Sequence, residues 1–89
     1  MKRPLPNISV LLPAFNAEKY IELAIQSILN QTYSNFELII LNDGSSDRTE
    51  EIIKSFKDTR VIYIKNEQNI GLVNTLNKGL SLAKGKYIA

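Results

Sequence analysis

The sequence predicts an α/β fold in which a mostly parallel sheet has helices on both faces, in the order β-α-β-α-β-α-β. Two observations predict it. Short, almost continuously apolar runs alternate along the chain with longer segments whose apolar residues recur every three or four positions. The segments between them are polar and contain turn-forming residues. Strands and helices that alternate in this way form parallel sheets, because each helix returns the chain to the same edge of the sheet.

The expected strands are the apolar runs. The first covers residues 8–12 and stops at Pro13, and the second covers residues 36–41. The second run is apolar at nearly every position, which is typical of a strand that is covered on both faces. A third strand is expected at residues 61–64, and a fourth begins at Tyr87.

The helices are expected from the periodic segments. The first covers residues 17–30 with Asn16 as its N-cap, and its apolar face holds Ile21, Ala24, Ile25 and Ile28. The second begins near Asp47, which forms a variant of the capping box with Glu50, and its apolar face holds Ile52, Ile53 and Phe56. In the third helix the spacing predicts that Val73, Leu76, Leu80 and Ala83 face the sheet, with Gly85 as a C-cap.

Composition limits the possible functions. The 89 residues make one domain at most, and a chain of this size buries only roughly 60–65% of the surface that its unfolded form exposes, so we expect marginal stability. The chain is 44% apolar and 22% charged, as ordinary globular proteins are. Its net charge of +2 is too small, and its basic residues too sparse, to indicate nucleic acid binding.

Two further classes of feature are not expected. Because the chain has neither cysteine nor histidine, disulfides, thiolate metal sites, the common zinc sites and imidazole catalysis are excluded. No stretch is apolar for the roughly 18 residues that a membrane helix needs, and prolines interrupt the N-terminal segment, so we expect neither a membrane span nor a signal peptide. The absence of cysteine is compatible with a reducing cytoplasm.

Ligands of open parallel sheets bind beyond the carboxyl ends of the strands, so the loops at those ends are candidate binding segments. The first, residues 13–16, contains no glycine, whereas a dinucleotide-binding fold needs Gly-x-Gly-x-x-Gly there. Two interpretations remain open. Either Pro13 ends a strand and Asn16 caps a helix, or the backbone and the Phe15 ring also lie beside a base or a ribose.

The second loop, residues 42–47, holds two aspartates. Asp43 leaves a strand that is buried on both faces, and Gly44 after it allows a sharp turn. A carboxylate in that position can accept a hydrogen bond from a base imide or a ribose hydroxyl. Both aspartates could instead bind backbone N–H groups at the start of the next helix. We expect Asp47 to do the latter and Asp43 to bind the ligand.

The third loop contains Asn69-Ile70-Gly71 and opens a helix. The N–H groups at the start of that helix could face a phosphate. An N-cap followed by a glycine that approaches the sheet closely is an equally good interpretation.

Together these segments resemble the family 2 glycosyltransferases, the inverting enzymes of the GT-A fold. The resemblance covers nearly the whole chain, from residue 8 to residue 89. It is carried by the segments VLLPAFN (10–16), SILNQTY (27–33), FELIILNDGSSD (36–47), NIG (69–71), LNKG (76–79) and AKGKYIA (83–89). Each is weak alone, but their order and spacing are similar to those of the family. The family often has an arginine where this chain has Leu76.

The resemblance implies a Rossmann-like GT-A half-domain in which residues 1–89 form the nucleotide-sugar-binding part. The residues it implies at the nucleotide are Pro13, Ala14, Phe15, Asn16, Asp43, Ser45 and Gly71. It also implies that an Asp-x-Asp motif for Mn²⁺ or Mg²⁺ and a catalytic carboxylate follow Ala89. We therefore expect no catalytic residue and no metal ligand within the chain.

The function implied is the transfer of a sugar from a nucleoside diphosphate sugar, most simply a UDP-sugar, to an acceptor hydroxyl with inversion. By analogy with the family this serves surface polysaccharide synthesis, in the cytoplasm or at the inner face of the membrane. The alternative is a non-catalytic α/β module that binds a nucleotide weakly or serves in self-association. An unfinished sheet edge favours a homo-oligomer.

Overall fold

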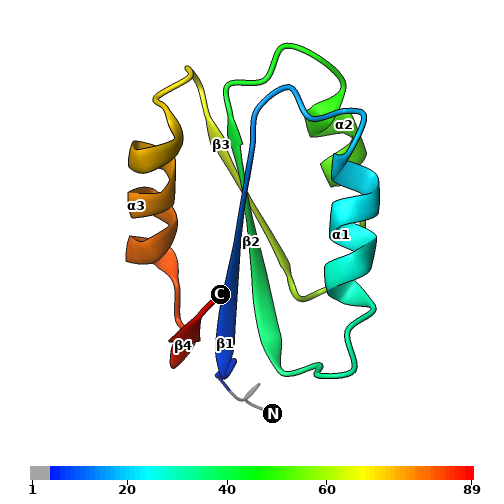
Figure 1. Cartoon of the computed structure of the whole chain (residues 1–89), viewed down its shortest axis with the longest axis vertical. Coiled ribbons are helices and arrows are strands. Elements are labelled where there is room, and N and C mark those ends of the chain that lie inside the picture. The colour runs from blue at the N-terminus through cyan, green and yellow to red at the C-terminus, as the bar shows by residue number, and fades with distance from the viewer. Residues whose placement is uncertain (1–4) are drawn as a thin grey trace.

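The computed structural model describes residues 5–89. Four parallel strands form one sheet in the order β3-β2-β1-β4, with α1 and α2 on one face and α3 on the other (Figure 1). The elements are β1 (Ile8–Ala14), α1 (Ile21–Leu29), β2 (Phe36–Asp43), α2 (Thr49–Lys54), β3 (Val61–Asn66), α3 (Leu72–Leu82) and β4 (Tyr87–Ile88). The predicted fold class and element order are confirmed.

Strand β2 is the centre of the molecule. All eight of its residues are buried, because it pairs with β1 and β3 and is covered by helices on both faces. On the face of α1 and α2 the core is formed by Ile21, Ile25, Leu38, Ile40 and Ile53 with their neighbours. The continuous apolar run in the sequence reflects this two-sided burial.

Strand β1 runs two residues further than predicted and includes Pro13, which pairs in register with Leu41. A proline is tolerated here because β4 pairs only with Ile8 and Ser9. At Pro13 the side of β1 that would lie against β4 has no paired strand among the described residues, so the missing N–H leaves no hydrogen bond unmade there. The longer strand carries Pro13 and Ala14 to the carboxyl edge of the sheet.

Helix α1 begins four residues later than predicted, and Asn16 does not cap it. The N-cap position is Tyr20, without a side-chain hydrogen bond. The N–H groups that precede the helix are satisfied by the β2–α2 loop instead: Ala17 donates to Thr49 Oγ1 and Glu18 donates to Asp47 Oδ2. Contacts distant in sequence therefore set the start of this helix.

The capping box predicted for α2 is wrong, because the N-cap position is Arg48 and no side chain caps the helix from there. Asp47 Oδ1 accepts from the backbone N–H of Thr49 over 3.0 Å and also from its hydroxyl, as expected of a residue at the start of a helix. The carboxylate of Glu50 does not accept a hydrogen bond from a backbone N–H at the start of the helix. It accepts a hydrogen bond from Tyr63 of β3.

The predicted inward face of α3 is only partly right, since Leu76 and Ala83 are half-buried but the other two residues are not. Val73 is 71% exposed and Leu80 is 49% exposed, whereas Thr75 and Gly79 are buried against the sheet. A Cβ on Gly79 would lie 3.1 Å from a methyl group of Leu41. The helix therefore packs closely through small residues, and most of its larger apolar residues, Leu76 excepted, are exposed.

Gly85 is not the C-cap of α3, which is Ala83. A Cβ on Gly85 would overlap the backbone of Ser9, so the glycine is needed where the α3–β4 connection crosses β1. Its N–H donates to Ser9 Oγ over 2.7 Å. Ser9 in turn donates to the buried carboxylate of Glu37, which also accepts from the N–H of Lys84.

Candidate functional site

Three loops meet at the carboxyl edge of the sheet, after β1, β2 and β3. They surround a cavity of about 230 Å³. Its lining residues are Pro13, Ala14, Phe15, Asp43, Asn69, Gly71, Leu72 and Thr75. Five of the seven residues predicted at the nucleotide thus share one cavity, although they come from segments about thirty residues apart in the sequence.

Asp43 is the last residue of β2 and lies at this cavity with only 5% of its surface exposed. Its carboxylate already has partners in the third loop. Oδ1 accepts from the N–H of Ile70 over 2.8 Å and from the amide of Asn66 over 3.0 Å, while Oδ2 accepts from the N–H of Gly71 over 3.0 Å. Asp43 is therefore an anchor for the third loop, a role that the sequence analysis assigned only to Asp47.

These hydrogen bonds determine the ionisation of Asp43. Burial alone would raise its pKa. Donors to the carboxylate outweigh burial and hold the pKa below its ordinary value, the donors being Ile70, Asn66, Gly71 and Thr75. The group is consequently a carboxylate, and an acceptor only, at neutral pH.

Gly44 and Gly71 allow the second and third loops to meet. Gly44 has a φ of +71°, and a Cβ there would lie 2.6 Å from the backbone nitrogen of Asn69. Gly71 has a φ of +89°, also in the region that favours glycine. A Cβ on Gly71 would have open space around it, so its glycine is required by backbone conformation alone.

Asn16 and Ser45 do not line the cavity but join the first loop to the second. The N–H of Asn16 donates to Ser45 Oγ over 2.9 Å. In return, Asn16 Oδ1 accepts from the N–H of Ser46 over 2.8 Å. Asn16 holds this position with a φ of +48°, which asparagine tolerates better than most residues. All seven predicted site residues therefore lie at one edge of the sheet, five in the cavity and two beside it.

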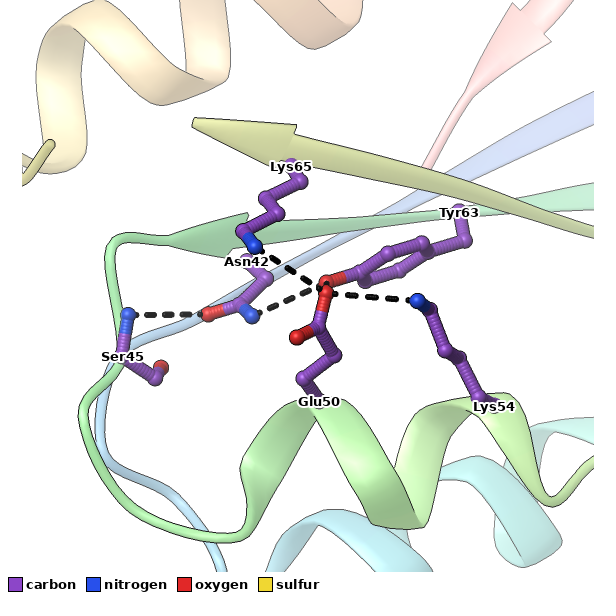
Figure 2. A network of polar contacts seen from close by, with 6 residues as sticks. All are labelled: Asn42, Ser45, Glu50, Lys54, Tyr63 and Lys65. Carbon is purple, nitrogen blue, oxygen red and sulfur yellow. Dashed lines mark hydrogen bonds and ion pairs between the residues drawn. The ribbon is translucent and has the colours of Figure 1, made fainter. Parts of the chain in front are cut away.

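A second polar network supports the loop from the opposite face of the sheet (Figure 2). Asn42 is buried, its Oδ1 accepts from the N–H of Ser45, and its Nδ2 donates to the Tyr63 hydroxyl. Tyr63 donates to Glu50 Oε2 over 2.8 Å, and Lys54 and Lys65 lie 3.5 Å from that carboxylate. This network was not predicted, because its members are distributed over two strands, a loop and a helix.

The ionisation of the network follows from its contacts. The hydrogen bond from Tyr63 is the largest influence on Glu50 and, together with Lys54 and Lys65, lowers the pKa of Glu50 despite its partial burial. Burial and the neighbouring Glu50 raise the pKa of Tyr63. At neutral pH the tyrosine is therefore a neutral donor to a charged acceptor.

The sequence analysis also missed Asn66, Thr75 and Lys78, which lie behind Asp43. Asn66 donates to both Asp43 and Thr75 Oγ1, and Lys78 Nζ donates to Asn66 Oδ1 over 2.7 Å. A usable signal was present at Asn66, which follows the apolar run 61–64 after one intervening lysine, much as Asn42 follows the run 36–41. Nothing in the spacing indicated Lys78.

A larger cavity of about 740 Å³ lies at the amino edge of the sheet, where Arg60 pairs with Asp58, and none of the predicted residues lines it. Across residues 5–89, no group of three or more His, Cys, Asp or Glu could hold a metal ion. Within the same residues, no helix has the length and apolar character needed to cross a membrane.

The fold and the cavity define the class of the protein: an open parallel α/β protein whose candidate site lies beyond the carboxyl ends of its strands. The family follows from comparison with known sequences. Residues 9–89 match the family model described as glycosyl transferase family 2, and the chain belongs to this family.

Two relatives show the extent of the similarity. The chain is 50% identical over 88 residues to an uncharacterized glycosyltransferase of Haemophilus influenzae, covering 94% of this chain and 27% of the relative. It is 43% identical over 82 residues to the UDP-Glc:alpha-D-GlcNAc-diphosphoundecaprenol beta-1,3-glucosyltransferase WfaP of Escherichia coli, covering 92% and 33%. The chain thus spans about a quarter to a third of the length of these relatives.

Solved structures have the same fold. Residues 1–349 of Staphylococcus aureus TarS, in complex with UDP-GlcNAc, superpose with a TM-score of 0.86 and 28% identity, covering 92% of this chain and 25% of that fragment. Glucosyl-3-phosphoglycerate synthase of Mycobacterium tuberculosis, in complex with Mn²⁺, UDP and glucosyl-3-phosphoglycerate, gives a TM-score of 0.70 and 31% identity, covering 90% and 30%. The GT-A type of fold expected from the resemblance is confirmed.

Proposed function

We propose that residues 1–89 form the nucleotide-binding part of an inverting glycosyltransferase that transfers a sugar from a UDP-sugar to an acceptor hydroxyl. The observation that carries this proposal is the cavity that brings Pro13, Phe15, Asp43 and Gly71 together. Its volume of about 230 Å³ is smaller than the roughly 300–1,000 Å³ of complete small-molecule sites, so it suits one part of the donor, the base. The activity for which WfaP is named and the complex of TarS with UDP-GlcNAc support a UDP-sugar as the donor class.

Asp43 is the residue we assign to the base. Its Oδ1 already accepts two hydrogen bonds and its Oδ2 only one, so Oδ2 has the larger remaining capacity as an acceptor. Uracil presents an imide N–H on its Watson–Crick edge, whereas cytosine presents an acceptor nitrogen there. A carboxylate at this place therefore favours UDP over CDP. The exposed ring of Phe15, on the cavity wall, is free to lie against the base.

The phosphates are assigned to the start of α3, beyond Gly71. Helix α3 begins at Leu72, with Gly71 as its N-cap and no side chain bonded to the free N–H groups of its first turn. Such groups attract phosphate. Asn16 and Ser45 hold the first and second loops together beside the cavity, and we place them around the ribose.

We assign no divalent metal site to the described residues. The enzyme of Mycobacterium tuberculosis was solved with Mn²⁺, but residues 5–89 hold no cluster of ligating side chains that fits such an ion. We therefore assign the metal site and the catalytic base to other parts of a longer enzyme and derive no step from them. Surface polysaccharide as the product, and a cytoplasmic location at the inner face of the membrane, stay predictions.

The test is calorimetric titration of the full-length enzyme with UDP and with CDP. Asp43→Asn should weaken UDP binding about ten- to a hundredfold, as expected for the loss of a charge-assisted hydrogen bond. CDP should be affected less, because asparagine can turn an N–H toward the acceptor nitrogen of cytosine. Asp47→Asn is the matched control in the same loop, and it should leave the ratio of the two affinities unchanged. Wild-type affinity for UDP in the Asp43 variant would refute the assignment.

A further inference from the structure

Asp43 is supported from behind by a buried amide. Asn66, the last residue of β3, is 4% exposed. Its Nδ2 donates to Asp43 Oδ1 over 3.0 Å and to Thr75 Oγ1 over 3.2 Å, so both of its N–H groups are used. Its Oδ1 accepts from Lys78 Nζ over 2.7 Å. The amide is thus held on both sides.

The hydrogen bond from Lys78 sets the orientation of the Asn66 side-chain amide. It lies on α3 three residues after Thr75, so the two side chains stand on the same side of the helix. An ammonium group only donates hydrogen bonds, so it requires the oxygen of Asn66 and leaves the nitrogen for Asp43. The stem of Lys78 lies at the surface, yet its charged end reaches a buried partner.

The three groups form a chain from ammonium to amide to carboxylate. A positive charge at the amide oxygen makes the amide N–H a stronger donor, and hydrogen bonds in such chains strengthen one another. Lys78 does not line the cavity. Its hydrogen bonds reach the cavity through Asn66, which is bonded to Asp43 and Thr75, two of the lining residues.

We propose that Lys78 is a positioning residue that acts through Asn66 to fix the Asp43 carboxylate, and that it thereby contributes to the preference for a base with an imide N–H. This inference rests on the proposed function, because it concerns how Asp43 meets the base. A carboxylate held in one orientation accepts a hydrogen bond from the uracil N–H and repels the cytosine nitrogen. A carboxylate that is free to rotate discriminates less well between the two bases.

The experiment measures the affinities of the full-length enzyme for UDP and CDP by calorimetry. Lys78→Met removes the ammonium and keeps the apolar stem. It should weaken UDP binding about two- to tenfold, the cost of one lost hydrogen bond, with a smaller effect on CDP. Lys78→Arg keeps a charged donor and should restore the UDP to CDP ratio. Lys57→Met, an exposed lysine in the α2–β3 connection, is the matched control and should bind both nucleotides as the wild type does.

The ratio separates positioning from general support. If Lys78→Met loses affinity for UDP and CDP by the same factor, or loses none, the inference is wrong. Asp43→Asn, measured in parallel, distinguishes the two levels of the proposal. If Asp43→Asn weakens UDP binding while Lys78→Met keeps the wild-type ratio, only the role of Lys78 falls. If Asp43→Asn binds UDP normally, the assignment of the base falls, and the inference falls with it.

Discussion

The two aspartates of the second loop have chemically similar surroundings and different positions. Asp47 binds the N–H groups of Glu18 and Thr49 and joins the first loop to the start of α2. Asp43 binds the N–H groups of Ile70 and Gly71 and joins β2 to the third loop. The sequence analysis treated ligand binding and backbone anchoring as alternatives for these residues. The structure gives both of them an anchoring role and places only Asp43 at the cavity.

The anchoring role of Asp43 has a pH dependence. Its pKa in the folded protein is lowered from the ordinary value of 3.8, so its contribution to stability is complete above that value and is lost as pH falls through the folded pKa. The difference in unfolding free energy between wild type and Asp43→Asn should therefore shrink as pH is lowered from about 5 to about 2. Urea unfolding at several pH values measures this difference. A difference that stays constant over the whole range would contradict the prediction.

At the scale of the elements, the sequence predicted every strand and helix but not all their limits. The apolar run sufficed for β2, because burial on both faces leaves Glu37 as the only polar residue between Phe36 and Leu41. The start of α1 could not be predicted, since Thr49 and Asp47 satisfy the N–H groups that a local cap would have served. Val73 and Leu80 were wrongly predicted to face the sheet because periodicity favours large apolar residues, whereas close packing on Leu41 requires Gly79.

Tyr63 links β3, β2 and α2, as Figure 2 shows. Tyr63→Phe should lower the unfolding free energy by about 1–3 kcal/mol, because it leaves the buried amide of Asn42 without its partner. Thermal or urea unfolding measures this loss, and Tyr20→Phe, at the exposed N-cap position of α1, is the control. The affinity for UDP should change little, because the network lies on the other face of the sheet from the cavity. A large loss of affinity without a loss of stability would contradict this account.

At the scale of the molecule, the position of the site was predictable and its internal contacts were not. Parallel topology places every carboxyl-end loop at one edge, so Phe15, Asp43 and Gly71 had to lie near one another. The hydrogen bonds of Asp43 depend on the path of the third loop, which spacing does not determine. The same holds for Asn66 and Lys78, whose meeting requires the packing of α3 on the sheet.

The surface predicts association of the isolated 89-residue chain. Helix α3 and strand β4 expose several large apolar side chains, namely Leu72, Val73, Leu80, Leu82, Tyr87 and Ile88. Such exposure favours self-association, so sedimentation should detect species larger than a monomer, and Leu80→Lys should shift the population toward monomer. Leu23→Lys, at an exposed leucine on α1, is the control and should have little effect. A strictly monomeric wild-type chain at high concentration would contradict the prediction.

The hydrogen bond between Ser9 and Gly85 has a consequence for how the protein is made. The two residues are 76 positions apart, and Ser9 lies in a strand at the interior of the sheet. On the ribosome, the first strand leaves the exit tunnel long before the segment that completes its hydrogen bonds has been synthesised. Contacts this distant also slow folding, because the chain must close a long loop before they can form. Strand β1 is therefore translated well before the segment that completes its hydrogen bonds.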